Sequence, residues 1–180
     1  LVPFGEYVPF TIFDSFFSFF NVNRPNVVSS DNNVLIKSKD LNISSAICYE
    51  IAYQDIFLKH GKQSNLLFNA SNDNWFGDTI GPYQHLQIAR YRAAENRKPL
   101  IRSTSTGVSA LINKFGSVVK SIDIDNLEQK VSNSQQIESI IFTRSGHTPF
   151  ITFGKWPSIF FILILIFGSF FNKMLRNEKD

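Results

Sequence analysis

The chain has 180 residues, of which 43% are hydrophobic, and a formal net charge of +3 at neutral pH. This amount of apolar material is enough for one domain with a sizeable core, which excludes a disordered chain. Lysine and arginine are spread between acidic residues, which argues against nucleic-acid binding, and the single cysteine excludes an internal disulfide and a metal site built from several thiolates.

The N-terminal third of the sequence begins with loops around one apolar segment. Two prolines and a glycine favour an ordered loop over residues 1–9, and Pro25 with clustered Ser, Asn and Asp favours another over 21–33. Residues 12–20 contain five phenylalanines and predict a short helix, packed either on the core or against lipid. Because Leu1 stands directly in the first loop, without a leader, we expect further residues to precede it in the complete protein.

The middle of the chain predicts strands around one long helix. The strands are short β-branched and apolar runs, at residues 34–36, 43–49, 65–69, 100–103, 109–113 and 118–122. The first two runs, separated by four polar residues, resemble a hairpin. Residues 83–97 carry apolar side chains at helical spacing between Pro82 and Pro99, which predicts a helix. Strands mixed with a long helix, without a repeat, indicate an α/β domain that ends near Ile141.

Residues 156–171 form a run of sixteen uncharged side chains that is hydrophobic on every face. As a helix this run would reach roughly 24 Å, slightly less than a hydrocarbon core of about 30 Å. The sequence therefore leaves two interpretations, a buried helix or a membrane span. Trp156, Pro157 and the basic residues that follow favour the span, and the positive-inside rule then predicts a cytoplasmic tail and a domain on the opposite side of the membrane.

Cys48 is the first candidate for chemistry, because it ends an apolar strand-like run. Strand ends are where α/β enzymes expose nucleophiles, since the sheet holds the backbone while the loop leaves the side chain accessible. The alternative is a structural thiol without reactivity. Glu50 and Glu6 could orient a cation or accept a proton. A Cys–His dyad with His85 is possible, although no spacing selects it.

Several segments resemble the nitrilase, or carbon-nitrogen hydrolase, superfamily. They are LVPFGEYVP at residues 1–9, ICYE at 47–50, SNDNWFG at 71–77 and RAAENRKP at 92–99. Within the superfamily, the first segment, GPYQH at 81–85 and the terminal apolar helix are similar to the apolipoprotein N-acyltransferase family. The resemblance runs over essentially the whole chain.

The resemblance implies an α/β fold, the C-terminal part of a nitrilase-type αββα sandwich, followed by one transmembrane helix. The expected boundaries are a partial catalytic domain at 1–145, a linker at 146–155, the transmembrane helix at 156–172 and a cytoplasmic tail at 173–180. The family uses a Glu-Lys-Cys triad whose cysteine matches Cys48. Its glutamate and lysine lie upstream of Leu1, so we expect this chain alone to be inactive.

The resemblance also implies supporting roles for Glu6, Tyr49 and Glu50, and neither a cofactor nor a metal. The implied reaction transfers a fatty acyl group from a membrane phospholipid to Cys48. The thioester then passes the group to the α-amino group of a diacylglyceryl-cysteine at the N-terminus of an apolipoprotein. This places the protein in the bacterial inner membrane, with a periplasmic catalytic domain. The rival hypotheses are a nitrilase-type amidase acting on a small amide and a membrane-tethered domain without catalysis.

Overall fold

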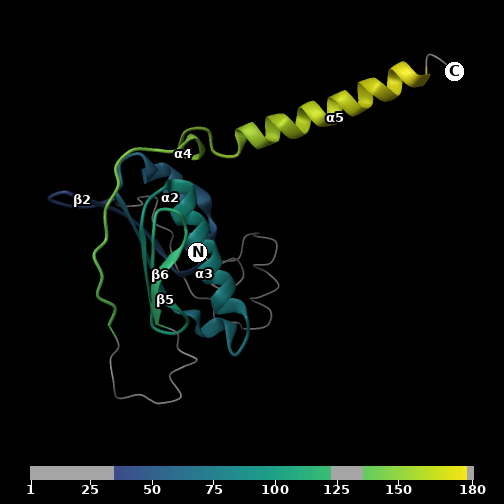
Figure 1. Cartoon of the computed structure of the whole chain (residues 1–180). Coiled ribbons are helices and arrows are strands. Elements are labelled where there is room, and N and C mark those ends of the chain that lie inside the picture. Colours follow the sequence, from purple (N-terminus) through teal and green to yellow (C-terminus); the bar gives the residue numbers. More distant parts are fainter. Residues whose placement is uncertain (1–34, 123–135, 178–180) are drawn as a thin grey trace, which may run out of the picture.

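The computed structural model describes residues 35–122 and 136–177, with side chains up to residue 169 (Figure 1). Its elements in chain order are β1 (Leu35–Ser38), β2 (Leu41–Ile47), η1 (Cys48–Ala52), α2 (Gln54–Gly61), β3 (Leu66–Ser71), η2 (Asp73–Phe76), α3 (Gly81–Asn96), β4 (Leu100–Thr104), β5 (Ser109–Ile112), β6 (Val118–Ile122), α4 (Pro149–Phe153) and α5 (Trp156–Asn177). Glu6 and the apolar segment 12–20 lie outside the described residues.

The strands form one mixed sheet in the order β1-β2-β3-β4-β5-β6. β1 and β2 pair as the expected antiparallel hairpin, β2, β3 and β4 are parallel, and β5 and β6 continue antiparallel. Parallel neighbours need long crossover connections, which α2 and α3 supply. The expected α/β domain is thus confirmed. Helix α2 was not predicted, because its eight residues are too few for a clear helical period.

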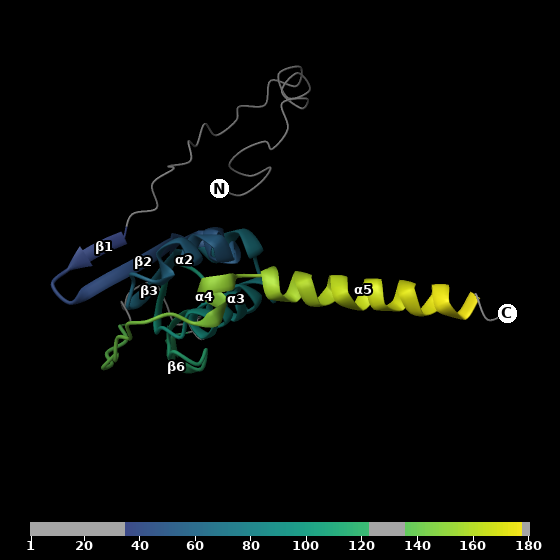
Figure 2. The same cartoon turned by 90° about the horizontal axis from the view of Figure 1, so that it is seen from above.

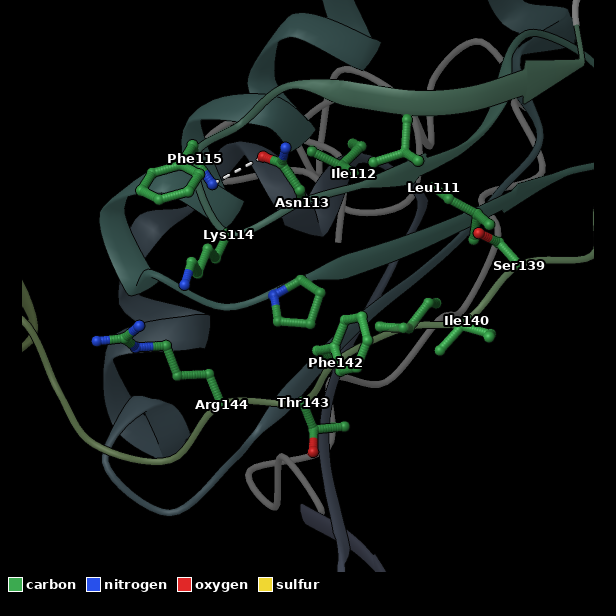
Figure 3. A pocket seen from close by; sticks show the side chains of 13 residues that line it. Leu111, Ile112, Asn113, Lys114, Phe115, Ser139, Ile140, Phe142, Thr143 and Arg144 are labelled. Atoms are coloured by element: carbon green, nitrogen blue, oxygen red, sulfur yellow. Dashed lines mark hydrogen bonds between the residues drawn. The ribbon is translucent and has the colours of Figure 1, made fainter.

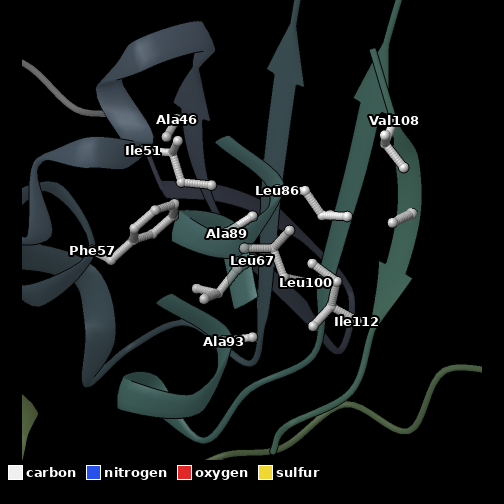
Figure 4. Close-up of a cluster of buried hydrophobic side chains, with 11 residues drawn as sticks. Ala46, Ile51, Phe57, Leu67, Leu86, Ala89, Ala93, Leu100, Val108 and Ile112 are labelled. Carbon is white, nitrogen blue, oxygen red and sulfur yellow. The ribbon is translucent and has the colours of Figure 1, made fainter. Parts of the chain in front are cut away.

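The hydrophobic core lies between the sheet and the two crossover helices (Figure 4). Strand residues at every second position meet helix residues at helical spacing, which matches the two periods of the elements. The buried cluster comprises Ala46, Ile51, Phe57, Leu67, Leu86, Ala89, Ala93, Leu100, Val108, Ala110 and Ile112. Its alanines on α3 let this helix approach the sheet closely. The carboxyl ends of β2, β3 and β4 are thereby held in fixed register.

The opposite face of the sheet is less completely covered. The strand register places Phe68, Ile101 and Leu111 in one row on this face. An extended segment after residue 136 runs along it in Figure 1, tied at one end by Lys120 Nζ donating to the Glu138 carbonyl and at the other by Arg144 N–H donating to the Asn65 carbonyl. This segment then turns back to the helical face, where the Thr148 hydroxyl donates to the carbonyl of Glu95 in α3.

The C-terminal part of the chain contains two helices. The expected linker 146–155 includes α4, whose Ile151 is buried against the domain. Helix α5 extends away from the sheet (Figure 2) and exposes its apolar side chains from Phe160 to Phe167. Within the described residues, no helix is both long and apolar enough to cross a membrane. The membrane span predicted at 156–172 is therefore not confirmed, and the sidedness that depends on it stays a prediction.

Candidate functional site

Cys48 lies where β2 ends and the 3-10 turn η1 begins, at the carboxyl edge of the parallel strands. Its φ is +51°, in the left-handed region that residues with a side chain rarely adopt. The thiol is partly exposed, and its Sγ lies 3.9 Å from the carbonyl oxygen of Asn72. A strained turn at a strand end presents a side chain to solvent while the sheet fixes its backbone. The geometry is therefore suited to a nucleophile.

The two residues after Cys48 form the rest of the turn. Glu50 Oε2 accepts a 2.8 Å hydrogen bond from the backbone N–H of Ile47, which closes the turn on the last strand residue. The Tyr49 ring packs edge-on against Tyr53, with centroids 6.1 Å apart, and lies equally far from the His85 ring. Glu50 thus supports the turn that carries Cys48, and Tyr49 links it to the interior.

The polar loop after β3 forms a second wall beside Cys48. It contains the 3-10 turn η2, where the Asn72 side chain accepts from the backbone N–H of Asn74 at 3.1 Å and from the Thr106 hydroxyl at 2.5 Å. The Trp75 side chain is 84% exposed although it is large and apolar. Because a large apolar side chain is usually buried, an exposed tryptophan on the loop next to Cys48 is suited to contact with an apolar ligand.

A buried polar network lies below Cys48, and sequence reasoning did not find it. Arg102 Nη2 donates to Asp73 Oδ2 at 2.6 Å, and His85 Nδ1 is 2.8 Å from Asp73 Oδ1. Arg102 also donates through Nη1 to the Asn69 side-chain oxygen. All four residues are at most 2% exposed. His85, the candidate for a dyad with Cys48, is thus paired with a carboxylate. Its residue type and its position in the GPYQH segment pointed to it, but not to its partner Asp73.

The electrostatics of this network favour the ionised carboxylate. Burial by itself raises the pKa of Asp73, but hydrogen bonds from His85 and Ser71 and the charge of Arg102 outweigh this effect and hold the pKa below its ordinary value of 3.8. Burial lowers the pKa of Arg102, and Asp73 opposes that shift. The network therefore contains a neutralised ion pair in the domain interior.

A largely apolar pocket lies between the β5–β6 hairpin and the segment after residue 138, lined among others by Pro99, Phe115 and Phe142 (Figure 3). It does not include Cys48. Within residues 35–122 and 136–177, no group of three or more His, Cys, Asp or Glu side chains is gathered that could hold a metal ion.

Comparison with protein families decides the relationship. The family model described as carbon-nitrogen hydrolase matches residues 2–136, which is most of the chain. The chain belongs to the carbon-nitrogen hydrolase family. The mixed sheet with its helices is the α/β fold of this family, and the resemblance seen in the sequence is confirmed.

Among carbon-nitrogen hydrolases, the chain is similar to proteins named apolipoprotein N-acyltransferase. It is 33% identical to that of Pseudomonas paraeruginosa and 37% identical to that of Pasteurella multocida, in each case over 99% of this chain and 34% of the relative. The chain thus spans about a third of the length of these relatives. A solved structure of Saccharomyces cerevisiae Nit3, a nitrilase superfamily member, aligns with a TM-score of 0.47 at 16% identity, covering 54% of this chain and 39% of Nit3.

In this carbon-nitrogen hydrolase, the structure brings together three of the four residues expected to act. Cys48, Tyr49 and Glu50 are consecutive in η1, and Glu6 lies outside the described residues. Their individual roles stay predictions. The residues that sequence reasoning missed, Asn69, Asp73 and Arg102, come from separate strands and turns, and only the fold places them under the cysteine.

Proposed function

We propose that the complete protein is an apolipoprotein N-acyltransferase whose nucleophile is Cys48. The observation that carries this proposal is the placement of Cys48 in a left-handed turn at the carboxyl edge of the sheet. The similarity of almost the whole chain to relatives of that name supports it. In a two-step acyl transfer of this kind, a thiol first attacks an ester, and an amine then attacks the resulting thioester.

In the first step, the Cys48 thiolate attacks the ester carbonyl of a membrane phospholipid. A carbon–sulfur bond forms, the bond from the carbonyl carbon to the glycerol oxygen breaks, and that oxygen leaves with a proton as the lysophospholipid alcohol. A glutamate and a lysine upstream of Leu1 would act as base and oxyanion partner. We assign no residue of this chain to those two roles.

In the second step, the free α-amino group of a diacylglyceryl-cysteine attacks the thioester carbonyl. A carbon–nitrogen bond forms, the carbon–sulfur bond breaks and the sulfur takes up a proton, which restores the thiol. Exclusion of water favours the amine over hydrolysis. In this proposal Glu50 holds the turn, while Tyr49 and Glu6 line the reaction site.

The exposed apolar side chains support lipid substrates. Ile47 and Tyr53, on either side of the turn, are 67% and 41% exposed, and Trp75 lies on the neighbouring loop. Helix α5 exposes apolar residues from Phe160 to Phe167. Exposed apolar surface of this extent marks a place of contact with a partner or a membrane. We propose that α5 contacts the bilayer in which both substrates reside.

The proposal is tested by mass spectrometry of the full-length protein purified with phospholipid, as wild type and as Cys48→Ala. We expect a fatty-acyl adduct on the peptide that contains Cys48 in the wild type and none in the variant. Addition of a diacylglyceryl-cysteine peptide should remove the adduct and yield the N-acylated peptide. A thiol that alkylates normally but carries no acyl group would overturn the proposal in favour of hydrolysis of a small amide.

A further inference from the structure

The left-handed conformation of Cys48 has to be maintained by its surroundings. A residue with a side chain is strained at a φ of +51°, and such strain persists where contacts over-determine the conformation. If Cys48 is the nucleophile, as the proposed function has it, the groups that hold its backbone also aim its sulfur. The buried polar network below the turn contains such groups.

Asn69 connects the network to the turn. This residue of β3 is fully buried, and its side-chain Nδ2 donates to two carbonyl oxygens, that of Ala46 at 3.0 Å and that of Cys48 at 3.3 Å. These carbonyls lie on either side of Ile47, where the chain passes from strand to turn. One amide thereby ties the end of β2 to the residue with the strained backbone.

Arg102 determines which way the Asn69 amide points. A guanidinium can only donate, so the oxygen of the amide must face Arg102 and the nitrogen must face the two carbonyls. Arg102 itself is oriented by Asp73, which accepts at 2.6 Å. The direction of the Asn69 donor therefore depends on a charge pair between β4 and the turn η2.

Asp73 is in turn held from several sides. Its Oδ1 accepts from the Ser71 hydroxyl at 2.7 Å and is 2.8 Å from His85 Nδ1, and its backbone N–H donates to the Thr106 carbonyl at 3.2 Å. The His85 ring, 6.1 Å from the Tyr49 ring, meets the residue next to Cys48. The network thus reaches the turn twice, through the Asn69 amide and through the His85 ring.

We propose that Asn69, Asp73, His85 and Arg102 are positioning residues that hold the Cys48 turn in its reactive conformation. Buried ion pairs contribute little net stability, and apolar side chains of similar volume often replace them without loss. Core stability alone therefore gives no reason for a charged network at this place. The hydrogen bond from the network to the carbonyl of Cys48 gives such a reason. Hydrogen bonds fix the orientation of the groups that they join, which apolar packing does not.

The test compares Asn69→Leu with Ser44→Ala in the full-length protein. Asn69→Leu removes the donors to the turn and keeps a buried side chain. Ser44 is a matched control, because it is also buried on a neighbouring strand and its hydroxyl has no hydrogen-bond partner among the described residues. The readouts are taken on the folded fraction isolated by gel filtration. They are the rate of acyl-thioester formation at saturating phospholipid, the KM for phospholipid and the rate of iodoacetamide alkylation, each per titratable thiol.

We expect Asn69→Leu to lower the acylation rate per thiol about tenfold or more, with KM changed less than about twofold, since misaimed groups slow the chemical step. Ser44→Ala should leave both values unchanged. A purely structural role would reduce the amount of folded protein but not the rate per thiol, and that outcome would overturn the proposal. If Asn69→Leu does not fold, Arg102→Lys, which keeps the charge but loses the paired donors, is judged by the same criterion.

The alkylation rate separates this proposal from the proposed function. A wild-type protein that forms no acyl-enzyme refutes the acyltransferase, while the alkylation of Cys48 still reports on its turn. A changed alkylation rate in Asn69→Leu and an unchanged one in Ser44→Ala then support the positioning role. Equal alkylation rates in all three proteins would overturn it.

Discussion

The residue that organises the site is Cys48, and its neighbours show how one strained backbone conformation is supported. Glu50 closes the turn from the solvent side through the N–H of Ile47, and Asn69 holds it from the interior through the carbonyl of Cys48. The first contact is local in sequence, whereas the second spans 21 residues. A local pattern can therefore suggest the turn, but the interior support arises only after folding.

The lowered pKa of Asp73 predicts how the stability of the folded protein changes in acid. Its folded-state pKa lies below 3.8, so its stabilising contribution is complete above that pH and is lost as the pH falls through the lower folded-state value. We expect Asp73→Asn to be less stable near neutral pH by about 3 kcal/mol, because Arg102 loses its counter-charge. Thermal unfolding between pH 2 and pH 6 should show the difference shrinking in acid. Parallel curves would contradict this account of Asp73.

The buried Lys98 predicts that stability also rises with pH in the alkaline range. This lysine is fully buried, donates to the carbonyl of Gly61 at the end of α2, and has a pKa lowered by burial from 10.5 to about 8. The unfolded state then binds more protons between these values, so the stability of the wild type should rise with pH. Relative to Lys98→Met, we expect a gain of about 2 kcal/mol between pH 7 and pH 9.5. Unfolding measurements at both pH values test this, and a pH-independent difference would refute it.

At the scale of elements, the turn between β4 and β5 packs directly against the network. Gly107 has a φ of +97°, and a Cβ built there would lie 2.4 Å from Asp73 Oδ2. We expect Gly107→Ala to destabilise the protein by about 2 kcal/mol or more, because it displaces Asp73. Gly77→Ala is the matched control, since Gly77 also has a positive φ but nothing within 4 Å of a Cβ. Equal melting temperatures for the two variants would speak against the contact.

The exposed apolar surface of helix α5 predicts where lipid contacts the protein. Its residues from Phe160 to Phe167 are exposed, whereas α2 buries Phe57 against the sheet. A photoreactive phospholipid incorporated into membranes that contain the full-length protein should label peptides from α5 and not those from α2. Mass spectrometry of the digested protein identifies the labelled peptides. Labelling of α2 alone, or of neither helix, would refute the proposed contact between α5 and the bilayer.

At the scale of the whole molecule, the sheet has one face covered by helices and one that is only partly covered. Phe68 and Ile101 lie half-buried on the second face. We propose that upstream residues supply the second sheet of an αββα sandwich over it. Residues 1–180 expressed alone should then form no acyl-thioester, because the expected glutamate and lysine would also be missing. Thioester formation by this chain alone, measured by mass spectrometry, would contradict that expectation.

The sequence by itself determined the parts of this protein that depend on local pattern. The period of apolar residues located the hairpin, the parallel strands and helix α3, and the end of an apolar run placed Cys48 at a strand terminus. The motifs around Cys48 and residues 71–77 identified the family. These features could be predicted because neighbouring residues carry the whole signal.

Only the tertiary structure decided the order of the strands and the composition of the network under Cys48. Arg102 meets Asn69 and Asp73 across 33 and 29 residues, and each of them taken alone has the sequence context of an ordinary polar side chain. In the folded interior, Arg102 and Asp73 form a charge pair and Arg102 orients the Asn69 amide. They do so because a polar group removed from water must find a partner inside the fold. Which partner it finds depends on the strand register, and the register is a property of the assembled sheet.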